Sequence, residues 1–185
     1  MKKKNVFLLA IVATGMMSGL AAMPAMAAGD GTLNFSGSVI DAACTVAPDS
    51  KNMTVDFGTV GLAAFTKSAY PYGSNSKTIN VNLLDCPATI SSAVVKITGK
   101  GQSVKNQGTN LATDTGAGAA QGVAVMFATI NDSVVIQVNG EGKTYNINEG
   151  DNTLKFIAYV TPIDNTANVT AGTITATAQY TIVYP

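Results

Sequence analysis

Histidine, tryptophan and arginine are absent from the 185 residues. Without histidine the chain lacks the commonest general base and the commonest metal ligand in proteins. Without tryptophan it lacks the buried ring that an antibody-type domain carries in its core. The carboxylates form no catalytic group either, because they are scattered singly and often in turn-like segments: Asp49, Asp114, Asp132 and Asp164. We therefore expect no enzyme activity, no metal, no cofactor and no small-molecule substrate.

Basic residues are scarce. Lysine supplies all of the positive side chains, and three of the eleven lysines lie within the first four residues. The rest of the chain has eight lysines against eleven acidic residues, which gives a net charge of −3. Because a nucleic-acid-binding surface needs a basic patch, we expect no nucleic-acid partner.

Long apolar runs are also lacking, apart from one near the N-terminus. The chain opens Met-Lys-Lys-Lys, is mostly apolar from Val6 to Gly19, and then has small residues at Ala25 and Ala27. This order is typical of a secretory signal peptide. The run is shorter than the roughly 20 residues of a membrane-spanning helix. We predict a signal peptide over residues 1–27, cleaved between Ala27 and Ala28, with a retained membrane anchor as the alternative.

Only two cysteines occur, Cys44 and Cys86, and both follow the predicted cleavage site. Two cysteines in an oxidising compartment usually pair. A bridge between them would close a loop of about 40 residues and, on the chain-entropy model, stabilise the fold by roughly 4 kcal/mol. Two free thiols are the alternative.

The exported part has the pattern of an all-β protein, because apolar and polar residues alternate in short segments and no segment has a helical period. Strands are expected at Leu33–Val39, Met53–Phe57, Ile79–Leu83, Val94–Ile97, Val123–Ile130, Leu154–Val160 and Gly172–Tyr184. The 123–130 segment is apolar throughout, as in a strand buried on both faces. Many short strands separated by turns predict one antiparallel sandwich.

Two other segments carry turn or loop residues. Residues 101–122 are rich in glycine, alanine, threonine and asparagine, which predicts a long surface loop or a weak edge segment. Val134–Val138 and Lys143–Ile147 flank Asn139-Gly140. Because Asn-Gly favours the positive φ angles of a type I′ turn, the two flanking segments predict a β-hairpin.

The C-terminal segment is the most regular. A period of two places one set of residues on a single face of a strand, which we expect to lie in the core. This set is Gly172, Ile174, Ala176, Ala178, Tyr180, Ile182 and Tyr184. The other face carries four threonines, Gln179 and Val183.

Five features, taken in order behind the signal peptide, resemble the chaperone–usher pilin family, and within it the major subunits of type 1 fimbriae. They are the alternating Leu33–Val39 with its glycine, Asp41–Cys44 together with Asp85–Cys86, Val55–Val60, Asn152–Tyr159, and a C-terminal strand with Tyr184 next to last and Gly172 fourteen residues from the end. Each feature alone is weak, and their order is specific.

The resemblance implies an immunoglobulin-like antiparallel sandwich that lacks its last strand and contains a Cys44–Cys86 disulfide. It further implies a donor-strand extension over residues 28–40 and a pilin domain over 41–185. Leu33, Phe35, Gly37 and Val39 would fill the groove of a neighbouring subunit, with Gly37 where the groove is too narrow for a side chain. A periplasmic chaperone would bind the strand from Gly172 to Tyr184 and the carboxylate of Pro185, until exchange at an outer-membrane usher.

Other interpretations of these residues remain open. Leu33, Phe35 and Val39 also suit an ordinary edge strand of the chain's own sheet, Gly37 a bulge, and Tyr184 an aromatic at the edge of the core. The implied function is a structural subunit of a surface fimbria that supports adhesion, with identical or related pilins as partners. The alternative is a minor adaptor or tip-fibrillum subunit with a direct binding role, in which Tyr70-Pro71-Tyr72-Gly73 would be an exposed contact instead of a plain turn.

Overall fold

The computed structural model describes residues 33–36, 43–66, 74–164 and 169–185. The chain divides into two units, Met1–Ser38 and Val39–Pro185, and each is described by itself. The described part of the second unit has ten strands and two short helices. They are β1 (Thr45–Val46), α1 (Pro48–Lys51), α2 (Ala63–Thr66), β2 (Ser74–Cys86), β3 (Ser92–Gly99), β4 (Gly101–Val104), β5 (Gly108–Ala112), β6 (Val123–Thr129), β7 (Val135–Ile136), β8 (Lys143–Asn146), β9 (Gly150–Pro162) and β10 (Ala178–Val183). Neither of these helices is long and apolar enough to cross a membrane.

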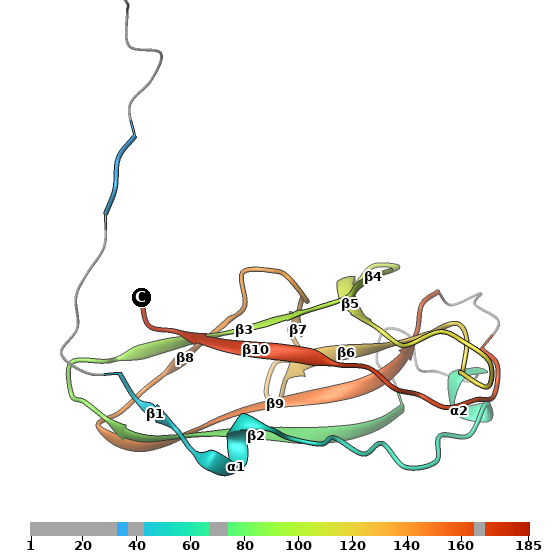
Figure 1. Ribbon diagram of the computed structural model, residues 1–185, viewed down its shortest axis with the longest axis horizontal. Coiled ribbons are helices and arrows are strands. Elements are labelled where there is room, and N and C mark those ends of the chain that lie inside the picture. The colour runs from blue at the N-terminus through green and yellow to red at the C-terminus, as the bar shows by residue number, and fades with distance from the viewer. Residues whose placement is uncertain (1–32, 37–42, 67–73, 165–168) are drawn as a thin grey trace, which may run out of the picture. The chain divides into compact units, whose positions relative to one another are not determined.

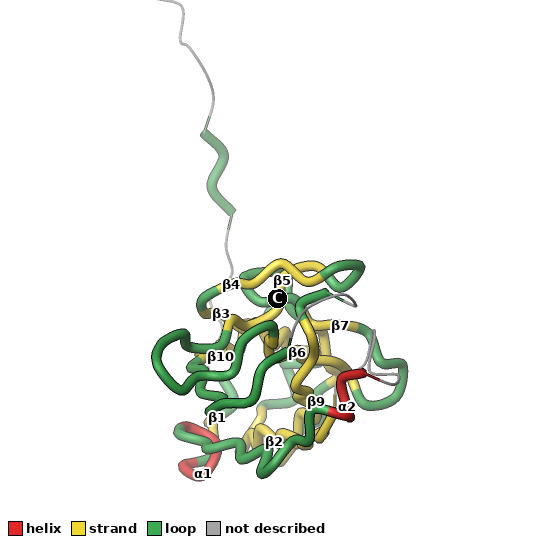
Figure 2. Tube along the Cα trace, turned by 90° about the vertical axis from the view of Figure 1, so that its right-hand side faces the viewer, coloured by secondary structure: helices red, strands yellow, loops and turns green. Residues whose placement is uncertain are grey.

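The strands form two sheets that pack face to face (Figure 1). The larger sheet has the order β1-β2-β9-β6-β5-β4, with β7 beside β6, and the smaller has the order β10-β3-β8. Every pair of neighbouring strands is antiparallel. The two short helices lie at the periphery, on opposite sides of the view in Figure 2. The predicted antiparallel sandwich is therefore confirmed.

Side chains from both sheets meet in one core. Val81 and Leu83 of β2, Val95 of β3 and Leu154 of β9 belong to the same cluster, and none of them is more than 1% exposed. Alternation places such residues inward because successive side chains of a strand point to opposite faces. All seven residues of β6 are buried, as its continuous apolar run predicts.

Residues 101–122 differ from the expected loop. They begin with the hairpin β4–β5, which forms one edge of the larger sheet. Val104 and Leu111 are buried from this hairpin, at 2% and 3% exposure. The polar Asn110 is fully buried as well, and its Nδ2 donates to Gln107 Oε1 at 3.2 Å. Two apolar anchors and one buried amide pair thus hold a polar segment in the sheet, and only the edge-segment alternative is confirmed.

The predicted hairpin around Asn139-Gly140 is wrong. β7 pairs with β6 in the larger sheet and β8 pairs with β3 in the smaller sheet, so the chain crosses between the sheets here. Asn139 has a positive φ of 61°, whereas Gly140 does not. Asn139 Nδ2 donates to the Gly99 carbonyl at 2.9 Å, and its Oδ1 accepts from Gly99 N–H at 3.2 Å. The asparagine side chain therefore binds the end of β3. The turn at residues 137–140, in which the Gly140 N–H donates to the Gln137 carbonyl at 3.2 Å, leads from one sheet to the other and closes no hairpin.

Candidate functional site: an open apolar groove

The C-terminal segment keeps the predicted alternation but is only half covered. Its inward residues are half-buried and pack against the core, whereas the residues between them are exposed. The inward set is Ile174, Ala176, Ala178, Tyr180, Ile182 and Tyr184. The expected long strand is assigned only over β10, which pairs with β3 along one edge and is the last strand of its sheet. The inward face therefore borders an opening in the sandwich.

The first half of this segment is held on one edge by residues 114–121. Thr173 N–H donates to the Gly118 carbonyl at 2.9 Å, and Ala120 N–H donates to the Thr173 carbonyl at 3.0 Å. In extended chain, the backbone groups of successive residues point to opposite edges. The N–H and C=O groups of Ile174 and Ala176 therefore point to the other edge, where the described residues offer them no hydrogen-bond partner.

The segment Met53–Phe57 lines the opposite side of the opening. Met53, Val55 and Phe57 are half-buried and alternate with exposed Thr54 and Asp56. The predicted strand is wrong here, because a strand needs a hydrogen-bonded neighbour and the described residues provide none for the backbone of residues 53–55. This side therefore presents a second row of backbone groups that lack partners.

Between these two walls lies a groove of about 1360 Å³. Its floor consists of apolar core side chains from both sheets: Ile79, Ile97, Leu111, Val125, Phe127, Phe156 and Ala158. In Figure 1, β10 and the chain that follows α1 both run along the long axis of the domain. The groove is thus an elongated apolar cleft, and each of its sides has backbone groups without a hydrogen-bond partner in the part of the chain that the structure describes.

The groove continues at one end into a smaller cavity of about 490 Å³. Both spaces are lined by Val55, Phe57 and Ile174. Gly172 lies beside this cavity, and a Cβ atom built on it would come within 2.3 Å of the Ala120 nitrogen. The glycine is thus needed for the close approach of two backbone segments.

Two tyrosines point from the C-terminal strand into the groove. Tyr180 donates its hydroxyl to the Ser50 carbonyl at 2.6 Å, whereas the Tyr184 hydroxyl is buried with no partner among the described residues. Burial raises the pKa of Tyr180, with a smaller contribution from the Asp49 carboxylate. Burial also raises the pKa of Tyr184. Both phenols are therefore neutral at physiological pH.

Cys44 and Cys86 form the predicted disulfide, with Cα atoms 4.2 Å apart. It joins the chain just before β1 to the last residue of β2, and β1 pairs with β2. Because Cys44 also lines the groove, the bridge fixes the chain that leads into the Met53–Phe57 wall to β2 of the larger sheet.

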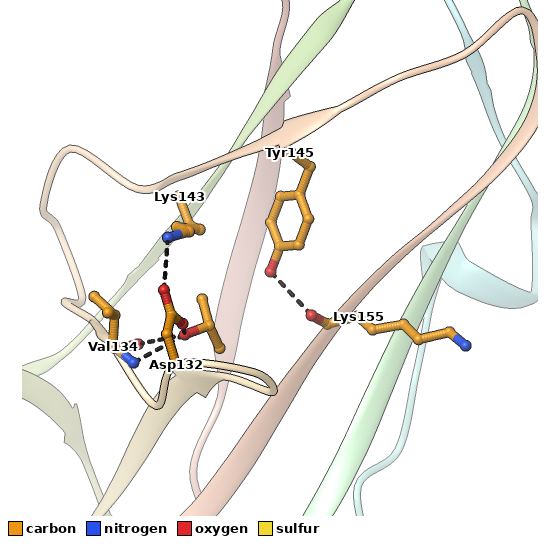
Figure 3. A network of polar contacts seen from close by, with 6 residues as sticks. Asp132, Val134, Lys143, Tyr145 and Lys155 are labelled. Atoms are coloured by element: carbon orange, nitrogen blue, oxygen red, sulfur yellow. Dashed lines mark hydrogen bonds and ion pairs between the residues drawn. The ribbon is translucent and has the colours of Figure 1, made fainter.

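A network of polar side chains lies away from the groove (Figure 3). Lys143 Nζ is 3.5 Å from Asp132 Oδ2, and Thr129 Oγ1 donates to Asp132 Oδ1. The Thr129 hydrogen bond, helped by Lys143, lowers the pKa of Asp132. The Tyr145 hydroxyl donates to the Lys155 carbonyl at 3.1 Å. Burial, with the Asp132 charge, raises the pKa of Tyr145 to about 12.

The predicted donor residues are only partly within the described chain. Leu33 and Phe35 are 83% and 91% exposed, and their segment has no regular secondary structure. Gly37 and Val39 lie outside the described residues, as do Ala27, Ala28 and the Tyr70–Gly73 segment. The donor and cleavage assignments therefore stay predictions.

The sequence model of the family described as "Fimbrial protein" matches residues 33–185. The chain belongs to the fimbrial protein family. The match covers the groove, the disulfide and the Leu33–Phe35 segment, and fimbrial subunits are structural proteins, not enzymes. The predicted membership of the pilin family is confirmed.

Individual comparisons agree with this fimbrial assignment. The probable major fimbrial subunit LpfA of Escherichia coli O157:H7 is 32% identical over 184 residues, which cover 98% of this chain and 97% of that protein. The P pilus rod subunit PapA has a similar fold, with a TM-score of 0.62 and 22% identity over 78% of this chain and all of that one. A subunit from the structure of a chaperone–usher pilus has a TM-score of 0.63, at 24% identity over 88% of this chain and all of that one. The immunoglobulin-like pilin fold is thereby confirmed.

The sequence predicted the inward face of the C-terminal wall, but it did not predict that Met53–Phe57 forms the other wall of the groove. The alternation of Met53, Val55 and Phe57 was visible, but alternation shows which face is apolar and gives no information on whether a neighbour pairs with the backbone. The Tyr180–Ser50 contact was missed too, because the two residues are 130 positions apart. Predicting this contact requires knowing that β10 packs against α1, which local sequence patterns do not show.

Proposed function

We propose that this fimbrial subunit accepts, in its groove, the N-terminal strand of a neighbouring subunit. One observation carries the proposal: two rows of backbone groups that have no partner among the described residues face an apolar cleft that reaches the core. Buried backbone N–H and C=O groups are nearly always paired, so a strand laid between the walls would complete the fold. Strand addition at an exposed sheet edge is a known mode of recognition, and donor-strand complementation of pilins is one example of it.

The inserted strand would be Leu33–Val39 of the next subunit. Leu33 and Phe35 are large apolar side chains with 83% and 91% exposure, and such groups gain from burial. Each would contribute roughly 1.5–3 kcal/mol when fully buried. Each new backbone hydrogen bond would add about 0.5–1.5 kcal/mol. Together these gains are comparable to the stability of a whole domain, about 5–15 kcal/mol, so a completed subunit should unfold slowly.

Export and assembly follow the order that the sequence implies. Residues 1–27 direct the chain out of the cytoplasm, residues 28–40 form the donor extension and residues 41–185 form the pilin domain. A periplasmic chaperone covers the face from Gly172 to Tyr184 and binds the Pro185 carboxylate, and an outer-membrane usher exchanges that chaperone for the donor strand. The product is a surface fimbria that supports adhesion.

A shaft role is favoured over the adaptor role. The LpfA relative, which aligns over 98% of this chain, is named a probable major fimbrial subunit. Immunogold electron microscopy of intact cells should label the whole length of the filaments with an antibody against this chain. Labelling restricted to filament tips would assign it to the adaptor class instead.

Two substitutions test the donor and the acceptor separately. Phe35→Asp should leave a subunit that accepts a strand but cannot donate one, because a carboxylate is costly to bury in an apolar groove. Ala176→Asp places the same charge on the inward face of the acceptor wall and should leave a subunit that donates but cannot accept. Neither variant alone should form fibres, whereas the two mixed should form only dimers, as measured by size-exclusion chromatography and light scattering.

Matched controls carry the same charge outside the site. Val134→Asp replaces another exposed apolar residue, which is 48% exposed on the turn after β6. Val183→Asp lies on the exposed face of β10 and is not among the residues that line the groove. Both should polymerise like the parent chain. Normal fibres from Phe35→Asp would remove the donor assignment, and normal fibres from Ala176→Asp would remove the groove as the acceptor.

A further inference from the structure

Two tyrosines of the smaller sheet each donate a hydroxyl hydrogen bond to a backbone carbonyl outside that sheet, and each such bond is called a tie below. On the groove side, Tyr180 of β10 donates to the Ser50 carbonyl at 2.6 Å. On the side away from the groove, Tyr145 of β8 donates to the Lys155 carbonyl of β9 at 3.1 Å. β10 and β8 are the two outer strands of the smaller sheet. One tie therefore lies within the groove and the other does not, since Tyr180 lines the groove and Tyr145 is not among its lining residues.

The groove-side tie is anchored on the larger sheet. Ser50 is 1% exposed, and its Oγ accepts a hydrogen bond from the backbone N–H of Asn82 in β2 at 3.0 Å. The connection thus runs from β10 through Tyr180 and Ser50 to β2. It is the one hydrogen bond between residues 43–60 and 169–185 that the described chain shows.

The position of the tie along the groove follows from a second contact. Phe57 and Ile174 pack in the same apolar cluster at the end near the smaller cavity. With Ser50 opposite Tyr180, the two walls therefore run antiparallel to each other. The tie joins the walls close to α1, and the stretch between it and the Phe57–Ile174 contact has no other cross-wall hydrogen bond among the described residues.

The Tyr180–Ser50 bond lies on the core-facing side of the walls. Tyr180 is on the inward face of β10 and packs against the core, and its acceptor belongs to a buried residue. A strand inserted level with the walls would cover this bond without breaking it. A hydrogen bond is stronger when it is shielded from water, so insertion of the strand and formation of the bond would favour each other.

We propose that Tyr180 is a positioning residue for strand insertion: its bond to Ser50 fixes the spacing of the two walls at the width of one added strand. This inference rests on the proposed acceptor function. A preorganised site loses less conformational freedom on binding. Tyr180→Phe keeps the ring and its packing and removes only the bond, so it should weaken retention of the donor more than it weakens the subunit.

The test uses the full exported chain with Phe35→Asp, so that the protein can accept but not donate. Complexes are formed with a labelled peptide of residues 29–41, which keeps Phe35, and three acceptors are compared: the parent, Tyr180→Phe and Tyr145→Phe. Excess unlabelled peptide is added at a fixed, mildly denaturing urea concentration, and the release rate is followed by fluorescence anisotropy. Starting from the complex avoids any need for a stable empty subunit.

Release from the Tyr180→Phe acceptor should be about fivefold faster than from the parent, as expected for one lost hydrogen bond. Tyr145→Phe loses an equivalent tie on the other side and should release the peptide at the parent rate. Equal rates for Tyr180→Phe and the parent would overturn the inference, as would equal acceleration by both variants, which would indicate general loosening. Failure of the parent to bind the peptide at all would instead refute the proposed acceptor function.

Discussion

At the scale of single residues, Gly172 fits the period-two pattern of the C-terminal strand, but a different feature of the structure requires a glycine there. The period-two pattern places it on the same face as Ile174 and Tyr184, yet Gly172 itself is exposed. What requires a glycine is the backbone of residues 119–120, which a Cβ atom would approach to within 2.3 Å. Because rigid backbone is involved, the chain cannot relieve this contact by moving a side chain.

Gly172→Ala should therefore destabilise the subunit by about 1–3 kcal/mol, the usual cost of forcing extra volume into a packed site. Gly61→Ala is the matched control, since a Cβ there would have no atom within 4 Å, and it should stay within about 0.5 kcal/mol of the parent. Urea unfolding followed by circular dichroism measures both. Equal midpoints for the two variants would show that residues 119–120 can move away.

At the scale of elements, the sequence predicted which side chains face the core better than it predicted which strands pair with each other. The alternation in β2, β9 and the C-terminal strand identified the inward side chains, because side-chain direction depends only on local period. Pairing depends on distant segments, which is why the predicted hairpin at Asn139 was wrong and why residues 53–55 have no backbone partner among the described residues. Leu33 and Phe35 share this ambiguity, since an alternating segment suits a strand of its own sheet and a strand of another subunit equally well.

The disulfide is the element-scale constraint that the sequence predicted correctly. It joins residues that are 42 positions apart, from the residue before β1 to the last residue of β2. On the chain-entropy model, its removal should cost about 4 kcal/mol of unfolding free energy. We expect Cys44→Ala with Cys86→Ala to lower the urea midpoint accordingly. The parent chain under a reducing agent separates the cross-link from packing: it should lose as much as the double variant, and a reduced parent as stable as the oxidised one would contradict the prediction.

At the scale of the whole molecule, the subunit is a sandwich whose core is open along one side. The floor of the groove consists of core residues from both sheets, so whatever fills the groove also completes the core. Binding of the donor strand should therefore raise the unfolding free energy of the subunit that accepts it. A ligand that binds only the folded chain adds RT ln(1 + [L]/Kd) to the unfolding free energy, about 2.7 kcal/mol at a concentration of 100 times Kd.

The melting temperature of the Phe35→Asp subunit should therefore rise with the concentration of the 29–41 peptide. For a domain of this size, about 2.7 kcal/mol corresponds to a rise of roughly 5–10 °C, and each further tenfold in peptide should add about 1.4 kcal/mol, or roughly 3–6 °C. Differential scanning calorimetry measures the shift, with Val183→Asp in the acceptor as a variant that should respond fully and Ala176→Asp as one that should not respond. A melting temperature independent of the peptide would mean that the domain is already complete, because a core with no missing strand has nothing to gain from an added one.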